Sequence, residues 1–285
     1  QTPSQSFAVT LVMLPAIIAI IVLLVGSNIA RAFSLAGVFA IIRFRSAPGD
    51  PKDIAFVLFT MATGLACGMG FVVHIGGEKS HDILEDALTV LENLSHRGAH
   101  GADEHTGDGA GVLTQIPHAF FKRDLTTLGI SLPEAGHYGV GMIFAHRYED
   151  FRKRQIAAFE EIVKSEGQTI LGWREVPIDF TTIGESAKAA LPRFIQVFIG
   201  KSNDIACGMD FERKLFLIRK LAEKTIPQMS EDNGGIFYIS SLSSKTIVYK
   251  GMLTASQLRS FYLDLSDLDY ATALAMVHSR FSTNT

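Results

Sequence analysis

Three apolar stretches dominate the beginning of the chain. Residues 7–30 carry no charged side chain, and residues 11–25 within them are almost entirely aliphatic. A helix of about 20 apolar residues is long enough to cross a bilayer. A second apolar stretch, residues 32–42, is too short to cross alone, and a third runs over residues 54–77 without a formal charge. The pattern predicts hydrophobic membrane-type helices over residues 7–66.

From residue 78 onward, apolar and polar residues follow the periods of helices and strands. Helical spacing begins after Ser80, a residue type that suits the N-cap position. Short apolar runs bounded by turn residues predict strands between the helices. This order is typical of an α+β protein with antiparallel sheets covered by helices. The predicted helices are 82–93, 148–165 and 211–224, and the predicted strands are 109–116, 138–145, 194–199, 236–240 and 246–249, with a turn at 241–245 and a buried segment at 271–280.

Charge divides the chain at the same place. Residues 1–66 carry a net charge of +2, and the residues after them carry −5. Nucleic-acid binding needs a clustered basic face, so no nucleic-acid partner is predicted for this weakly acidic chain. Cys67 and Cys207 are too few for a disulfide framework, and no Cys or His spacing matches a metal site. The cysteine content favours a reducing compartment.

Cys67 opens an apolar run with two glycines, C-G-M-G-F-V. On these six residues alone it is either a buried structural thiol, since free Cys is often buried, or a nucleophile. Six motifs follow: ENLSHRGAHGAD (92–103), TGDGAG (106–111), LGWREVP (171–177), GESAKAA (184–190), SLSSKTIVYKGMLT (241–254) and HSRFSTNT (278–285). In this order they resemble the N-terminal class-II glutamine amidotransferase domain of the glutamate synthase large subunit, over residues 67–285.

The resemblance implies an N-terminal-nucleophile hydrolase, here an incomplete αββα sandwich with antiparallel sheets. In that family the catalytic Cys is the first residue of the mature chain, and its own α-amino group is the base. An α-amino group titrates near 7.7–8.0, so it can accept a thiol proton at neutral pH. The resemblance thus implies that Cys67 is the nucleophile once the Ala66–Cys67 bond is cleaved.

The resemblance also implies a substrate site. It assigns Arg280 to the α-carboxylate of L-glutamine, which a planar guanidinium binds with two hydrogen bonds. Thr283 and Asn284 are expected to line the same pocket. Arg97 either shapes the pocket beside the nucleophile or satisfies backbone carbonyls of its own loop. The family's Asn-Gly oxyanion hole would follow Thr285, so this fragment is expected to be inactive by itself.

The leading segment has a resemblance of its own. Residues 7–66 resemble an uncharacterised bacterial membrane-domain family, in the stretch RAFSLAGVFAIIRFRSAPGDPKDIAFVLFTMATGLACGMGF, which implies location and no chemistry. The two resemblances meet at GLACGMGF. One implies a spanning helix over residues 54–75, and the other an edge-accessible strand over residues 67–75, which one segment cannot form together. The predicted domains are a hydrophobic membrane-helix segment, 1–66, and an amidotransferase domain, 67–285, joined naturally or as a chimera.

The predicted function is release of ammonia from L-glutamine for glutamate synthesis in the cytoplasm. The intact family also uses FMN and an iron–sulfur cluster, both expected outside this chain. The missing synthase domains and a small subunit are expected partners, and the membrane is another if residues 7–66 span it. The alternative is a membrane-anchored, catalytically inactive structural or interaction module.

Overall fold

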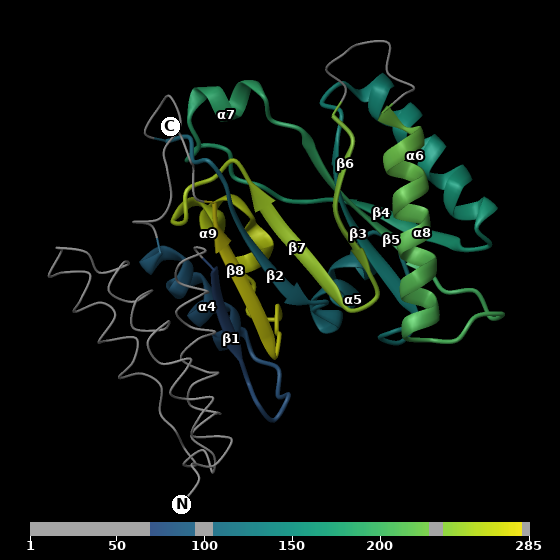
Figure 1. Cartoon of the computed structure of the whole chain (residues 1–285), viewed down its shortest axis with the longest axis horizontal. Coiled ribbons are helices and arrows are strands. Elements are labelled where there is room, and N and C mark those ends of the chain that lie inside the picture. Colours follow the sequence, from purple (N-terminus) through teal and green to yellow (C-terminus); the bar gives the residue numbers. More distant parts are fainter. Residues whose placement is uncertain (1–68, 95–104, 228–235, 281–285) are drawn as a thin grey trace, which may run out of the picture. The chain divides into compact units, whose positions relative to one another are not determined.

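The computed structural model describes residues 69–94, 105–227 and 236–280. The chain divides into residues 1–69 and residues 70–285, and apart from Met69 the described elements all belong to the second unit. Two four-stranded sheets form the frame of this part (Figure 1). The first sheet has the order β1 (Met69–Val73), β8 (Leu274–Ser279), β2 (Ala110–Gln115), β7 (Thr246–Gly251). The second has the order β4 (Thr169–Glu175), β5 (Arg193–Gly200), β3 (Tyr138–Ala145), β6 (Tyr238–Ser243).

Strands β6 and β7 are consecutive in the sequence but belong to different sheets. β6 ends at Ser243 and β7 begins at Thr246, so a tight connection carries the chain from the second sheet to the first. The sequence predicts a turn over residues 241–245, which is longer than the observed connection between Ser243 and Thr246. Ser241 still pairs with Met142 of β3, because the strand continues until the chain changes sheets.

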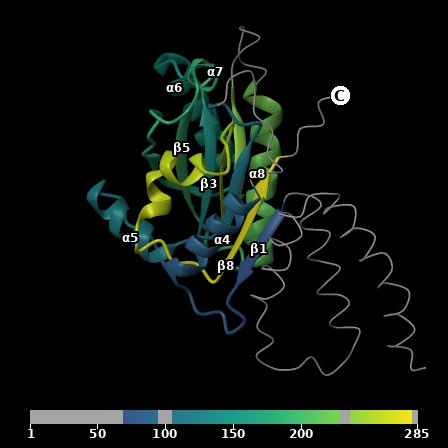
Figure 2. The same cartoon turned by 90° about the vertical axis from the view of Figure 1, so that its left-hand side faces the viewer.

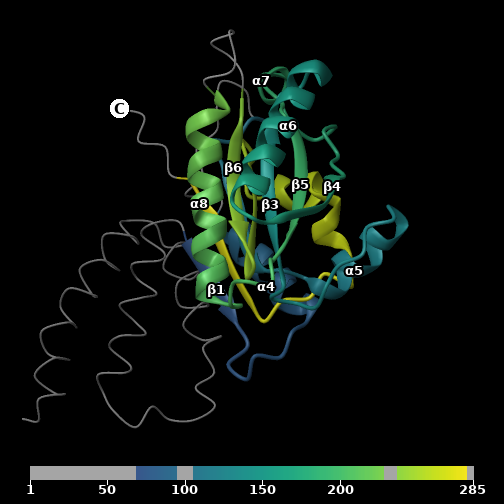
Figure 3. The same ribbon diagram turned by 90° about the vertical axis from the view of Figure 1, so that its right-hand side faces the viewer.

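Two long helices cover one face of the second sheet: α6 (Glu149–Ser165) and α8 (Met209–Thr225) (Figures 1 and 3). The apolar side of α8 repeats every three to four residues, with Phe211, Leu215 and Ile218 fully buried. These side chains pack with Phe159 of α6 against the sheet. Gly139 in β3 makes room for this, since a Cβ there would lie 2.6 Å from Leu215 Cδ1.

A second core lies between the inner faces of the two sheets and extends to the smaller helices. Val112 and Tyr249 of the first sheet, Val140 and Phe198 of the second, and Leu88 are all at most 1% exposed. Leu88 belongs to α4 (His81–Asn93), which begins after the predicted N-cap Ser80. The remaining helices are α5 (His118–Thr127), α7 (Glu185–Ala189), α9 (Gln257–Phe261) and the 3₁₀ helix η3 (Leu263–Ser266).

A buried polar cluster of Arg174, Asp264, Gln196, Tyr249 and Asp124 links the two sheets. The guanidinium of Arg174 donates two hydrogen bonds to the carboxylate of Asp264, at 2.8 and 2.9 Å. It also donates to Gln196 Oε1 at 2.9 Å and to Asp124. Tyr249, on the first sheet, donates to Asp264 at 2.8 Å and accepts from Gln196 Nε2 at 2.9 Å.

This cluster keeps Arg174 charged in the core. Burial alone would lower the pKa of Arg174, but the hydrogen bonds and negative charge of Asp264 outweigh it and raise that pKa. Arg174 and Asp264 are 5% and 2% exposed. A buried ion pair of this kind tolerates the loss of one partner poorly, because the other charge is left without compensation.

The described part is α+β with antiparallel sheets, as the sequence predicts. The predicted helices 82–93, 148–165 and 211–224 correspond to α4, α6 and α8, and the predicted strands to β2, β3, β5, β6 and β7. The segment 271–280 contains β8. Helix α5 and strand β4 are absent from the sequence prediction.

The two resemblances imply different structures for GLACGMGF, residues 64–71, and the structure describes the last three of these residues. Residues 69–73 form strand β1 at the edge of the first sheet, with Phe71 58% exposed. The expected spanning helix over residues 54–75 is therefore wrong for residues 69–73, and the edge strand expected over residues 67–75 is confirmed for the same five residues. The rest of residues 7–66 and the boundary before Cys67 lie outside the described residues. Within the described ranges, no helix has the length and apolar character needed to cross a membrane.

Candidate active site

Three of the sequence motifs meet at one end of the first sheet. Ala110, the first residue of β2, lies between Gly251, the last residue of β7, and Ser279, the last residue of β8. The TGDGAG motif, the end of the SLSSKTIVYKGMLT motif and the start of the HSRFSTNT motif are therefore neighbours in space, although the paired residues Ala110 and Ser279 are 169 positions apart in the sequence. We call this end of the sheet, where β2 begins and β7 and β8 end, the motif end.

Strand β1 begins at the motif end as well. It is the neighbour of β8, and the backbone N of His74 donates to the carbonyl of Ala273 at 2.9 Å. A Cβ on Gly70 would lie 2.9 Å from Val277 Cγ2. These contacts give β1 a direction opposite to β8, so β1 begins near the end of β8 (Figure 2).

Glycines allow the chain to turn closely at the motif end. A Cβ on Gly107 would lie 2.3 Å from the carbonyl carbon and oxygen of Leu253, so only glycine fits there. Gly109 has φ +142°, a conformation that residues with a Cβ rarely adopt. Its carbonyl accepts a hydrogen bond from the backbone N of Arg280 at 2.8 Å, which extends the pairing of β2 and β8 by one residue.

Three basic side chains share one face of the motif end. Lys250 and His278 pair with Gly111 from its two sides. Arg280 comes two residues after His278 and therefore points to the same face. Its guanidinium is exposed and makes no hydrogen bond or ion pair within the ranges that the structure describes. Such a group is available to bind a carboxylate.

The positive charges act on His278. Partial burial, followed by the charges of Arg280 and Lys250, lowers the pKa of His278 below its ordinary value of 6.5. Folding thus favours the neutral imidazole. The contribution of His278 to stability is present above about pH 6.5 and is lost as the pH falls through its lowered, folded-state pKa.

Replacing Arg280 by glutamine is expected to raise the pKa of His278, because one of the two neighbouring positive charges is removed. The measurement is an NMR titration of the His278 ring. Arg213→Gln removes the same charge from an exposed position on α8 and serves as the control. An unchanged His278 pKa in Arg280→Gln would contradict the charge arrangement described above.

Arg280 is thus the predicted site residue that the structure describes. Cys67, Arg97, Thr283 and Asn284 lie outside the described residues. Lys250 and His278 are additional residues of the candidate site. Both stand in motifs that the sequence shows, but only the strand register reveals that they flank Gly111.

Cys207 and the histidines give no competing site in the described part of the chain. Cys207 is exposed, and its Sγ lies 3.5 Å from Nε2 of His137, outside the motif end. Among the described residues, no group of three or more His, Cys, Asp or Glu could hold a metal ion.

Comparison with known proteins finds a family match for the beginning of the chain and another for the rest. Residues 67–285 match the family model "Glutamine amidotransferases class-II", and residues 1–85 match a domain of unknown function (DUF4956). The two matches overlap at residues 67–85, which include β1. The second match confirms that the leading segment resembles an uncharacterised family.

The relatives in this comparison are glutamate synthases. The NADPH glutamate synthase large chain of Bacillus subtilis is 48% identical over 220 residues, 77% of this chain and 14% of the relative. The NADH glutamate synthase of Schizosaccharomyces pombe is 40% identical over 77% of this chain and 10% of the relative. The chloroplastic ferredoxin-dependent glutamate synthase 2 of Arabidopsis thaliana is 37% identical over 92% and 16%. The chain thus spans a small part of each relative.

The family match covers more than half of the chain, and it includes the residues that form the motif end. The chain belongs to the class-II glutamine amidotransferases.

Proposed function

We propose that residues 67–285 are the glutamine-hydrolysing domain of a glutamate synthase large chain, with an N-terminal-nucleophile fold. The reaction converts L-glutamine and water to L-glutamate and ammonia, and the ammonia serves glutamate synthesis. The observation that carries the proposal is the motif end. There β1, which begins two residues after Cys67 in the sequence, is the neighbour of β8, and the exposed residue Arg280 directly follows β8. The glutamate synthase relatives support the same assignment.

The proposed chemistry starts with cleavage of the Ala66–Cys67 bond, which also places the domain boundary there. The freed α-amino group takes the proton of the thiol, and the thiolate attacks the side-chain amide carbon of glutamine. A carbon–sulfur bond forms, the carbon–nitrogen bond breaks, and ammonia leaves with the proton held by the amine. Water then hydrolyses the thioester, releasing glutamate and restoring the thiol.

The substrate is proposed to bind through its charged end. Arg280 binds the α-carboxylate, and Lys250 and His278 on the same face add to the positive potential. Thr283 and Asn284, which follow Arg280, and Arg97 are proposed to line the pocket. This assigns binding to the basic side of the motif end and the chemistry to Cys67.

We propose that the iron–sulfur cluster and FMN of glutamate synthases bind outside residues 67–285. An iron–sulfur cluster is held by several Cys thiolates, and the chain has two cysteines, of which Cys207 is exposed beside His137. These residues do not fit a cluster, and we place FMN with it in the remaining synthase domains. Those domains, and a small subunit, are the proposed partners. We place the domain in the cytoplasm, and a membrane attachment through residues 7–66 rests on their apolar pattern.

Replacing Arg280 by lysine tests the proposal in the full-length protein, by which we mean the amidotransferase domain together with the remaining synthase domains. We expect the KM for glutamine to rise about tenfold or more, since a lysine keeps the charge but loses one of two charge-assisted hydrogen bonds. The rate at which iodoacetamide labels Cys67 should stay unchanged. Steady-state kinetics with glutamine and labelling with mass-spectrometric readout measure the two effects.

Arg193→Lys is the matched control. Arg193 is an exposed arginine on β5 that pairs with Glu175 at 2.9 Å, and its replacement is expected to leave KM unchanged. If Arg280→Lys leaves KM unchanged and lowers the melting temperature instead, Arg280 is a structural residue and the substrate site lies elsewhere.

A further inference from the structure

The side chain of Gln257 joins three segments that are distant in the sequence. Gln257 is the first residue of α9 and is 7% exposed. Its Oε1 accepts a hydrogen bond from the backbone N of Thr254 at 2.8 Å. Its Nε2 donates to the carbonyl of His105 at 2.8 Å and to the carbonyl of Thr182 at 2.7 Å. Both protons of the amide nitrogen are thus used on separate parts of the chain.

Part of this arrangement closes the turn that leads into α9. Oε1 of Gln257 accepts from the backbone N of Thr254, three residues earlier, as a Glu or Gln side chain does in a capping box. That role needs an acceptor, which glutamate supplies equally well. The two hydrogen bonds from Nε2 are not needed to close this turn, and they require the amide.

The bond to His105 fixes one side of the motif end. Two residues later, Gly107 packs on the backbone of Leu253 and Thr254, with space for no side chain. Gln257 binds the chain on both sides of that contact, at Thr254 and at His105. Beyond Gly107, the carbonyl of Gly109 receives the backbone N of Arg280 at 2.8 Å. The segment that anchors Arg280 is therefore held in place by Gln257.

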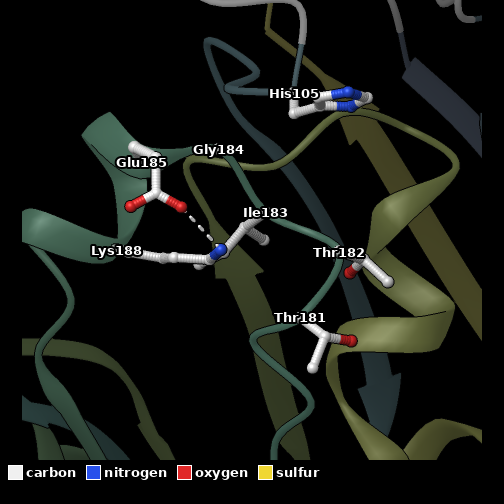
Figure 4. A pocket seen from close by; sticks show the side chains of 7 residues that line it. All are labelled: His105, Thr181, Thr182, Ile183, Gly184, Glu185 and Lys188. Atoms are coloured by element: carbon white, nitrogen blue, oxygen red, sulfur yellow. Dashed lines mark hydrogen bonds and ion pairs between the residues drawn. The ribbon is translucent and has the colours of Figure 1, made fainter.

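The hydrogen bond from Gln257 to Thr182 holds one side of a neighbouring cavity. His105, Thr182 and Gly184 line a cavity together with Thr181, Ile183, Glu185 and Lys188 (Figure 4). The backbone N of Gly184 donates to the same His105 carbonyl at 2.9 Å. The first residue of the GESAKAA segment is thereby joined to the residue before the TGDGAG segment at one oxygen atom, and Gln257 is bound to the chain just before both segments.

We infer that Gln257 is a positioning residue for glutamine hydrolysis, whose amide nitrogen holds residues 105–109 and 182–184 in place at the motif end so that Arg280 is aimed at the substrate. The inference rests on the proposed function, because the aim of Arg280 matters only if Arg280 binds glutamine. A small displacement of a binding group is enough to weaken a reaction that depends on orientation.

Gln257→Glu in the full-length protein tests this inference. Glutamate keeps the acceptor for the backbone N of Thr254 but removes both donors and places a carboxylate oxygen against two carbonyls. Hydrogen exchange of residues 105–111 and 181–185 is expected to accelerate about tenfold or more. The KM for glutamine should rise by a similar factor, with a smaller change in kcat.

Gln155→Glu is the matched control. Gln155 in α6 is 5% exposed, accepts from the backbone N of His146 at 2.9 Å and donates to the carbonyl of Ile236 at 3.2 Å. Gln155→Glu therefore also keeps a buried acceptor and replaces a buried amide donor by a carboxylate, but in α6 on the second sheet and away from the motif end. Both variants are expected to lower the melting temperature, but Gln155→Glu should leave KM and the exchange of residues 105–111 unchanged. Gln257→Met, of similar length and without charge, replaces Gln257→Glu if the carboxylate prevents folding.

The outcomes separate this inference from the proposed function. Unchanged exchange at residues 105–111 in Gln257→Glu overturns the positioning role, and so does an equal rise of KM in both Glu variants. If the unmodified amidotransferase domain, tested together with the remaining synthase domains, releases no ammonia from glutamine and glutamine does not protect Cys67 from labelling, the proposed function fails. Hydrogen exchange still shows in that case whether Gln257 holds the two segments.

Discussion

Replacing Arg174 by methionine is expected to lower the free energy of unfolding by about 3 to 5 kcal/mol. Methionine fills much of the same space but leaves the carboxylate of Asp264, 2% exposed, without its positive partner. Gln196 and Asp124 lose the hydrogen bonds that they accept from Arg174 at the same time. Urea denaturation of the full-length protein, followed by a spectroscopic signal of the described domain, measures the loss.

The control is Arg193→Met, which breaks an exposed pair with Glu175. Both side chains of that pair are more than half exposed, and the expected loss is about 1 kcal/mol or less. A double variant, Arg174→Met with Asp264→Leu, should recover much of the stability, because it removes both buried charges. Equal losses for Arg174→Met and Arg193→Met would show that the buried cluster does not stabilise the fold.

The same cluster explains why strand β4 could not be predicted from the sequence. Residues 169–175 do not alternate between apolar and polar: Ile170 and Leu171 are adjacent, and the charge of Arg174 normally indicates an exposed position. Its partner Asp264 lies 90 residues away, and Gln196 lies on the neighbouring strand. Burial of this charge depends on contacts that local periodicity does not contain.

Helix α5 was not predicted because the residues at its beginning give no start signal. It follows Pro117, and no side chain caps its first turn, so the usual start signal is missing. By contrast, α4 follows Ser80 and α8 carries a full apolar stripe, and both were predicted within one or two residues. The start signal with helical spacing in α4 and the apolar stripe in α8 were each sufficient for prediction.

The candidate site was predictable in its parts and not in its assembly. The motifs around Gly107, Gly251 and Arg280 are visible in the sequence. Their contact follows from the strand order β1-β8-β2-β7, which differs from the order in the sequence. The hydrogen bonds of the Gln257 side chain could not be predicted from the sequence for the same reason, since its three partners come from separate segments.

Replacing Cys67 by serine is expected to reduce glutamine hydrolysis in the full-length protein by on the order of 10³-fold or more, as loss of a catalytic nucleophile does. A hydroxyl is far less acidic than a thiol, and an α-amino group is too weak a base to activate it. Ammonia release from glutamine measures the loss, and N-terminal analysis of the unmodified protein shows whether Cys67 is its first residue.

Cys207→Ser is the control that this chain offers for that experiment, because it removes the other thiol. Cys207 is exposed and lies beside His137, so its thiol is accessible and could be mistaken for a reactive group. We expect Cys207→Ser to keep full activity and to retain glutamine-protected labelling at Cys67. If Cys207→Ser loses activity instead, or if Cys67→Ser keeps it, the nucleophile has been assigned to the wrong cysteine. Labelling of both variants by the same alkylating agent then identifies which thiol reacts with the substrate, because glutamine protects only the thiol in its own site.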